Sequence, residues 1–264
     1  MKTSVTKLQI FTMLKLQDEM NSIVNPDWRN AGYNWPRAIM VEAVEAIEHA
    51  AWKWWKHQVP NMPQVQMEMI DIWHFALSLM MQDPEAGNAK HLDDIATEIM
   101  SRLDCESSTQ GTDENLRLQQ IVINGRIRDC DSNTTLQDDL QTICGMAAGD
   151  AFNVIIFSHA LSKTGMSWQD LYRTYIGKNC LNIFRQENGY KTGSYIKDWS
   201  ALILRADLGK SIVPGVPPRI LEDNDHLYEI LETINLESEH VRQHVMGELK
   251  NRYAAVVSRS VHPK

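Results

Sequence analysis

Four polar side chains interrupt an otherwise apolar stretch of the chain, and three of them are of types that bind cations. They are Glu68, Asp71, His74 and Ser78, within the stretch Met67–Met81. Spacings of three, three and four residues place them on one stripe of an α-helix. A helix that is apolar nearly all round is buried, so its carboxylates need either a Lys or Arg partner or a metal ion.

A second acidic stripe lies upstream, in a helix that we expect at about 36–56. Glu42, Glu45 and Glu48 are three residues apart, which is typical of a solvated helix face. Trp52 projects to the same side, and so large an aromatic ring suggests that something covers this face.

If these two helices face each other, each contributes an acid-x-x-acid pair, Glu42 with Glu45 and Glu68 with Asp71. Carboxylates three apart share one helix face, and four converging carboxylates bind hard divalent cations such as Mg²⁺ or Mn²⁺. Such a site predicts a substrate with phosphoryl groups and a hydroxide nucleophile generated at the metal.

A basic helix face and a glycine-bearing loop occur together further along the chain. Lys178, Asn182 and Arg185 follow one another at intervals of four and three, so they share one face. The loop sequence G-Y-K-T-G-S-Y-I-K-D-W follows at 189–199. Basic side chains beside a flexible loop suit a polyphosphate, although other basic surface loops look similar.

Two amides and a tryptophan cluster are candidates for binding an organic group. Gln17 and Asn21 lie four apart in a helix expected at 5–23. They form either a solvated face, which is the simpler interpretation, or a pair that reads a pyrimidine edge, since an amide both donates and accepts. The sequence W-K-W-W-K at 52–56 offers rings for stacking and ammonium groups for anions. The alternative is that the rings pack in the core and the lysines place positive charge at the C-terminal end of a helix.

Composition argues against several classes of protein. The 264 residues, 43% of them hydrophobic, suffice for one large domain or two small ones. A net charge of −8 argues against a nucleic-acid-binding surface, and no apolar run is long enough to span a membrane. The sequence shows no signal peptide, and its four cysteines are too dispersed for zinc or a disulfide framework, so we expect a cytoplasmic protein.

Helices must position all of these groups, because strand signals are scarce. We expect an all-α bundle with a rigid core at 1–83 and 136–264 and an inserted or mobile helical segment at 84–135, where the apolar run 121–123 is ambiguous. Four further helices are predicted. One lies at 88–103, and the next begins at a Thr134 or Thr135 cap and runs to about Leu161. The third begins at the capping box Ser167-x-x-Asp170 and ends at Asn188-Gly189, and the last lies within 223–258.

Five patches together resemble the dimeric all-α dUTPases, relatives of the MazG-like and phage dCTPase-type nucleoside triphosphate pyrophosphohydrolases. The patches are L-Q-D-E-M-N at 16–21, N-W-P-R-A-I-M-V-E-A-V-E at 34–45, W-K-W-W-K at 52–56, E-M-I-D-I-W-H-F-A-L-S at 68–78, and Y-I-G-K-N-C-L-N-I-F-R-Q-E-N-G-Y-K-T-G-S-Y-I-K-D-W at 175–199. No single patch is specific, but the combination is. The resemblance implies the all-α NTP pyrophosphohydrolase fold and a homodimer whose active site the partner chain completes.

The resemblance also implies roles for individual residues. Two or three Mg²⁺ ions, or Mn²⁺, would be held by Glu42, Glu45, Glu68 and Asp71, with Glu45 or Glu42 positioning the attacking water. The residues implied around the base and sugar are Gln17, Asn21, Trp54, His74, Phe75 and Asn182. Those implied at the phosphates are Lys178, Arg185, Tyr190, Lys191 and Lys197.

One feature departs from the family pattern. The family has Glu-Asp-Asn soon after the Lys-x-Trp of the last patch, whereas here an insertion at 200–221 follows Trp199. The triplet Glu222-Asp223-Asn224 comes only after it, so Asn224 is a further candidate site residue.

The function implied is hydrolysis of dUTP, and of dUDP, to dUMP, with release of diphosphate or phosphate and attack of water at the β-phosphorus. A related pyrophosphohydrolase acting on dCTP or other nucleoside triphosphates is the nearest alternative. A di-iron helical bundle would use Asp71-x-x-His74, but no second such element is found. A non-enzymatic, acidic helical interaction protein is the alternative of another class.

Overall fold

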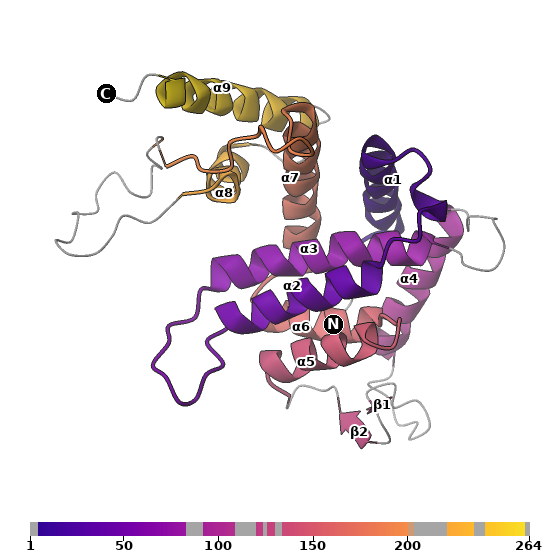
Figure 1. Cartoon of the computed structure of the whole chain (residues 1–264). Helices are drawn as coiled ribbons and strands as arrows, with labels where there is room; N and C mark the ends of the chain where they lie inside the picture. The colour runs from indigo at the N-terminus through magenta and orange to yellow at the C-terminus, as the bar shows by residue number, and fades with distance from the viewer. Residues whose placement is uncertain are drawn as a thin grey trace. The chain divides into compact units, whose positions relative to one another are not determined.

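The computed structural model describes residues 5–82, 92–108, 120–123, 126–129, 134–200, 202, 221–234 and 241–261. Within these ranges the regular secondary structure is helical apart from one antiparallel hairpin, which confirms the all-α prediction (Figure 1). The elements are α1 (Lys7–Val24), the 3₁₀ helix η1 (Trp28–Asn30), α2 (Trp35–His49), α3 (Met62–Met81), α4 (Leu92–Ser108), β1 (Gln120–Ile123), β2 (Arg126–Asp129), α5 (Leu136–Ala147), α6 (Val154–Lys163), α7 (Trp168–Glu187), α8 (Asp223–Thr233) and α9 (Val241–Val261).

The chain forms two compact units, Met1–Tyr172 and Arg173–Lys264. In the first unit α2 lies along α3 on one side and along α5 on the other, while α1 packs against α3 and α4 (Figure 1). The apolar stretch expected to be buried is indeed the core helix α3. Its Trp73 stacks on Phe157 of α6, with ring centroids 5.1 Å apart, and meets the edge of Trp168.

The helix predicted at 36–56 is shorter than expected. The α2 helix ends at His49, because Ala51 adopts a left-handed backbone conformation with φ 57° that an α-helix cannot continue. The W-K-W-W-K sequence is therefore a loop and not the last turn of a helix, so the alternative of charge placement at a helix end does not apply to it.

The single helix predicted from residue 134 or 135 to about 161 is wrong. A break at 148–153, with Asp150 at φ 58°, separates α5 from α6. The cap itself is confirmed: Thr135 and Asp138 form a capping box at the start of α5. Asn153 caps α6 by accepting from the backbone of Ile155 and Ile156.

The ends of α7 match the predicted signals. Ser167 and Asp170 exchange the hydrogen bonds of a capping box before its first turn. After its last turn Gly189 takes φ 89°, a conformation that favours glycine. In the second unit, α7, α8 and α9 surround a core whose centre is Trp199, with Phe184 and Leu227 beside it.

The segment 84–135 is described only in part. Its α4 corresponds to the helix predicted at 88–103 and packs against α1 and α6, and the ambiguous apolar run is strand β1, paired antiparallel with β2. The predicted domain division stays a prediction, and the insertion at 200–221 lies outside the described residues except at its ends and Leu202. Among the described helices, none is long and apolar enough to span a bilayer.

Candidate active site

Two neighbouring helices bring three carboxylates together in the first unit. Oxygen atoms of Glu42 from α2 and of Glu68 and Asp71 from α3 all lie within 4.8 Å of one another. Glu68 is 7% exposed, and the other two are half-buried. Oxygen donors gathered so closely can hold a hard divalent cation, which offsets the repulsion between them. This is the arrangement expected from the two acid-x-x-acid pairs, with one exception.

The exception is Glu45. Its side chain is exposed, and the structure does not place it in the carboxylate group formed by the described residues around Glu68. The third acid of the α2 stripe, Glu48, turns to the loop that follows. There it accepts from Trp52 Nε1 at 2.8 Å and pairs with Lys53, and these two hydrogen bonds lower the pKa of the Glu48 carboxyl. Thus one acid of the α2 stripe, Glu42, joins those of α3.

A buried polar network joins α1 to α3 in the same unit. His74 Nδ1 lies 2.6 Å from Gln17 Oε1, while Gln17 Nε2 donates to Asn21 Oδ1 at 2.9 Å. Ser78 Oγ accepts from both amide nitrogens at 3.0 Å. All four side chains are less than 9% exposed, so the simpler interpretation of Gln17 and Asn21 as a solvated face is wrong. Because His74 faces Gln17 and is not part of the carboxylate group, the geometry does not support the di-iron alternative.

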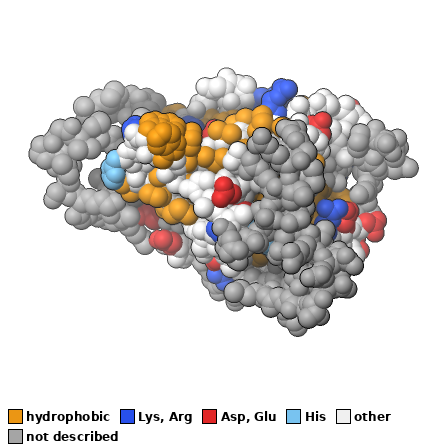
Figure 2. Space-filling model, turned by 90° about the horizontal axis from the view of Figure 1, so that it is seen from below, with side chains coloured by type: hydrophobic (Ala, Val, Ile, Leu, Met, Phe, Trp, Pro, Cys, Tyr) orange, Lys and Arg blue, Asp and Glu red, His pale blue; other side chains and the backbone are white. Residues whose placement is uncertain are grey.

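Aromatic side chains expected near the base divide into two groups. Phe75 is half-buried and stacks on Trp35, with centroids 6.2 Å apart and an interplanar angle of 29°. Trp54 is 89% exposed and meets the edge of Trp55 in the loop after α2. Figure 2 shows hydrophobic side chains exposed on the face of the molecule seen from below. Because its side chain is 89% exposed, Trp54 is available to another surface and is not enclosed by its own chain.

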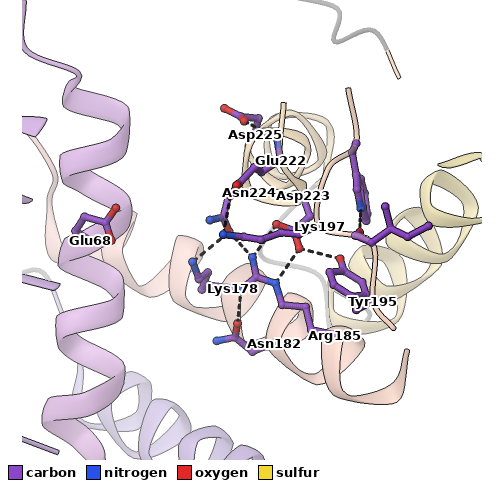
Figure 3. A network of polar contacts seen from close by, with 12 residues as sticks. Glu68, Lys178, Asn182, Arg185, Tyr195, Lys197, Glu222, Asp223, Asn224 and Asp225 are labelled. Atoms are coloured by element: carbon purple, nitrogen blue, oxygen red, sulfur yellow. Dashed lines mark hydrogen bonds and ion pairs between the residues drawn. The ribbon is translucent and has the colours of Figure 1, made fainter. Parts of the chain in front are cut away.

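The second unit contains another polar network, at the start of α8 (Figure 3). Arg185 donates from Nε and Nη2 to the two carboxylate oxygens of Asp223, at 2.8 and 2.7 Å. Asn224 Oδ1 accepts from Lys178 Nζ at 3.1 Å and from Arg185 Nη2 at 3.3 Å. Asn182 Oδ1 accepts from Arg185 Nη1 at 3.2 Å. Four predicted site residues, Asn224 included, thus belong to one network.

The centre of this network is the buried ion pair between Asp223 and Arg185. Burial opposes ionisation of the Asp223 carboxyl, but the Arg185 hydrogen bonds and charge outweigh it and hold the pKa below its ordinary value. Tyr195 also donates to Asp223 at 2.8 Å. Of the remaining predicted phosphate contacts, Tyr190 and Lys191 are exposed, and the Arg185 guanidinium lies 5.8 Å from the Tyr190 ring.

The insertion does not remove the acidic triplet from the Lys-x-Trp segment. The Trp199 N–H donates to the Leu221 carbonyl at 2.8 Å, and Asp198 forms an antiparallel bridge with Glu222. Lys197 Nζ pairs with Glu222 at 2.8 Å. Because the chain returns beside Trp199, residues separated by the insertion in sequence are neighbours in space.

Sequence reasoning left several residues of these networks without a role. Ser78 shared a stripe with Glu68, so the pattern contained the signal, but nothing showed that it faced the amides. Asp223 stood inside the triplet from which only Asn224 was selected. His49 Nε2 lies 3.6 Å from Glu68 Oε1, although no motif distinguished it. The partners of these side chains come from other helices, which spacing along one helix cannot identify.

The fold and these sites define an all-α protein with a carboxylate group able to bind a metal ion. Residues 9–190 match the profile of a protein family described as dUTPase. The chain therefore belongs to the dUTPase family and is a dUTP diphosphatase, a hydrolase of phosphoric anhydrides. No curated protein matches the chain.

Proposed function

We propose that this dUTPase is Mg²⁺-dependent and converts both dUTP and dUDP to dUMP, with release of diphosphate or phosphate. The observation that carries the proposal is the approach of the Glu42, Glu68 and Asp71 carboxylates to within 4.8 Å of one another. Three acids so close, with Glu68 only 7% exposed, repel one another, and a divalent cation bound between their oxygens would offset that repulsion.

The donor set fits magnesium. All three groups offer carboxylate oxygens, the ligands that Mg²⁺ prefers, so Glu42, Glu68 and Asp71 would hold the ions, two or three in number. When bound, Mg²⁺ supplies Lewis-acid stabilisation of phosphate charge and lowers the pKa of water. Glu45 is exposed one helical turn from Glu42, where its carboxylate can orient the attacking water toward the β-phosphorus.

Residues outside the carboxylate group are proposed to bind the nucleotide. In the first unit the buried amides of Gln17 and Asn21, with His74 and the half-buried Phe75, offer hydrogen bonds and a ring to the uracil. In the second unit Asn182 would contact the nucleoside. The residues proposed to contact phosphate are Lys178, Arg185, Tyr190, Lys191 and Lys197, with Asn224 holding Lys178 and Arg185 in place.

The test compares two glutamate-to-glutamine variants. Glu68→Gln removes a carboxylate from the group, and we expect kcat/KM for dUTP to fall by about 10²-fold or more, since a metal ion contributes several kcal/mol to catalysis. Glu48→Gln is the matched control, because its carboxylate faces Lys53 and Trp52. We expect wild-type activity there.

A binding measurement completes this test. Mg²⁺ should raise the melting temperature of wild type and of Glu48→Gln, but raise that of Glu68→Gln much less. Equal activity and equal magnesium stabilisation in both variants would contradict the proposed role of the carboxylates. Diphosphate release from dUTP and phosphate release from dUDP identify the products.

We also propose that the enzyme is a homodimer with a shared active site. Trp54, 89% exposed, supports this, because a base-stacking residue not enclosed by its own chain can complete a site in the partner. We expect Trp54→Ala and Glu68→Gln each to lower activity, and mixing the two proteins should raise it again, since a heterodimer contains one intact site. No recovery on mixing, or elution as a monomer, would refute the shared site. The proposed cytoplasmic location is tested by cell fractionation.

A further inference from the structure

The Ser78 hydroxyl holds two amides in one orientation. Its single hydrogen is donated to the backbone carbonyl of His74, at 3.0 Å and one turn back along α3. Its oxygen accepts from Gln17 Nε2 and from Asn21 Nδ2, each at 3.0 Å. Ser78 is fully buried, so bulk water cannot replace either bond.

Neither amide can turn over without losing a hydrogen bond. Turning would place an amide oxygen against Ser78 Oγ, whose hydrogen is already committed to the His74 carbonyl. Two buried acceptors would then face each other, which is costly. The observed orientation also directs Gln17 Oε1 to His74 Nδ1, at 2.6 Å, so Nδ1 carries the hydrogen. One hydroxyl thus determines two amide orientations and one imidazole tautomer.

This arrangement gives Asn21 a fixed donor. Its Nδ2 carries two hydrogens, and one is donated to Ser78, while the second has no acceptor among the side chains and backbone that the structure describes. Asn21 is 7% exposed, so this N–H points into a nearly enclosed environment. Uracil presents an acceptor O4 beside an N3–H donor, whereas cytosine presents a donor amino group beside an acceptor N3. A locked amide matches one of these patterns, and an amide free to turn matches both.

We propose that Ser78 is a positioning residue for base selection: its hydroxyl locks the Gln17 and Asn21 amides and thereby favours uracil over cytosine nucleotides. The inference rests on the proposed function, in which these amides contact the base. Ser78 itself need not touch the substrate, because it acts through the two amides.

The test measures kcat/KM for dUTP and for dCTP, each with Mg²⁺, in wild type and in Ser78→Ala. We expect the dUTP-to-dCTP ratio to fall by about tenfold or more, because the amides lose the hydrogen bonds that fix them. Both substrates are measured on one preparation, so a loss of folded protein lowers both values equally and leaves the ratio unchanged. In Ser78→Cys the side chain has a similar volume, but its sulfur is only a weak hydrogen-bond acceptor for the two amides. We therefore expect the dUTP-to-dCTP ratio to fall less than in Ser78→Ala.

Asn21→Ala separates failure of this inference from failure of the proposed function. If Asn21→Ala leaves KM for dUTP and the ratio unchanged, these amides do not contact the base, and that part of the proposed function is wrong. If Asn21→Ala changes KM for dUTP and the dUTP-to-dCTP ratio while Ser78→Ala leaves both unchanged, the amides contact the base but Ser78 has no positioning role. Should Ser78→Ala fail to fold, an unchanged ratio in Ser78→Cys overturns the inference.

Discussion

The ion pair between Arg185 and Asp223 makes the sharpest prediction about stability. The two side chains are 10% and 0% exposed and share two hydrogen bonds, of 2.7 and 2.8 Å. Removing one partner of a buried pair costs about 3–5 kcal/mol, because the other charge remains buried. In Asp223→Asn the side-chain oxygens of Asn182 and Asn224 still accept hydrogen bonds from Arg185. We therefore expect the free energy of unfolding to fall by about 3 kcal/mol, the lower end of this range.

The matched control is the adjacent acid. Glu222→Gln removes a carboxylate from a pair with Lys197 in which the side chains are 47% and 40% exposed. Exposed pairs contribute about 0–1 kcal/mol, so this variant should be nearly neutral. Both substitutions exchange an acid for its amide at the start of α8, and they differ mainly in burial.

Native-state hydrogen exchange measures the difference. In Asp223→Asn, amides of α8 and of the core around Trp199 should exchange about 100-fold faster, the equivalent of about 3 kcal/mol, while α2 and α3 provide an internal reference. In wild type this stabilisation should be complete above the ordinary Asp pKa of 3.8 and be lost as the pH falls through the lowered pKa of Asp223. If Asp223→Asn costs no more than Glu222→Gln, the assignment of this pair as the main stabilising contact of the network is refuted.

Three further predictions concern single side chains. Burial, and then the Arg252 charge, lower the pKa of the His226 imidazole. The folded chain therefore binds fewer protons than the unfolded chain below pH 6.5, and the second unit should lose stability as the pH falls below that value. His226→Gln should remove this dependence and flatten a plot of melting temperature against pH. Gly189→Ala, at φ 89° and against Ser194 Oγ, should cost about 1 kcal/mol or more by urea denaturation, and an unchanged midpoint would contradict the backbone argument. Thr135→Ala removes the α5 cap and should cost about 1 kcal/mol, whereas Thr135→Ser should restore it.

Much of the fold was predictable because its signals are local. The apolar stretch of α3, the threonine cap of α5, the capping box before α7 and the glycine after α7 each act within a few residues, and all are confirmed. The errors occurred where a single residue with positive φ overrode an otherwise helical pattern. Ala51 ends α2 early, and Asp150 lies in the break between α5 and α6. Neither alanine nor aspartate in a sequence is a reliable indicator of a left-handed backbone conformation.

The site was predictable to the extent that one helix face determines it. Spacing alone placed Glu68, Asp71, His74 and Ser78 on one stripe, but their partners differ: the first two meet Glu42, and the last two meet the amides of α1. Periodicity describes the direction of a side chain and not what lies opposite.

The sequence by itself determined the all-α class, the family and the identity of the acidic helices, because composition, periodicity and motif combinations are properties of the chain. Only the tertiary structure decided that Glu45 remains outside the group that Glu42 joins, that the two amides are buried, and that Glu222 returns beside Lys197 after the insertion. These outcomes depend on how helices pack and where loops return. Packing brings together residues far apart in the chain, and no local pattern records which of them will meet.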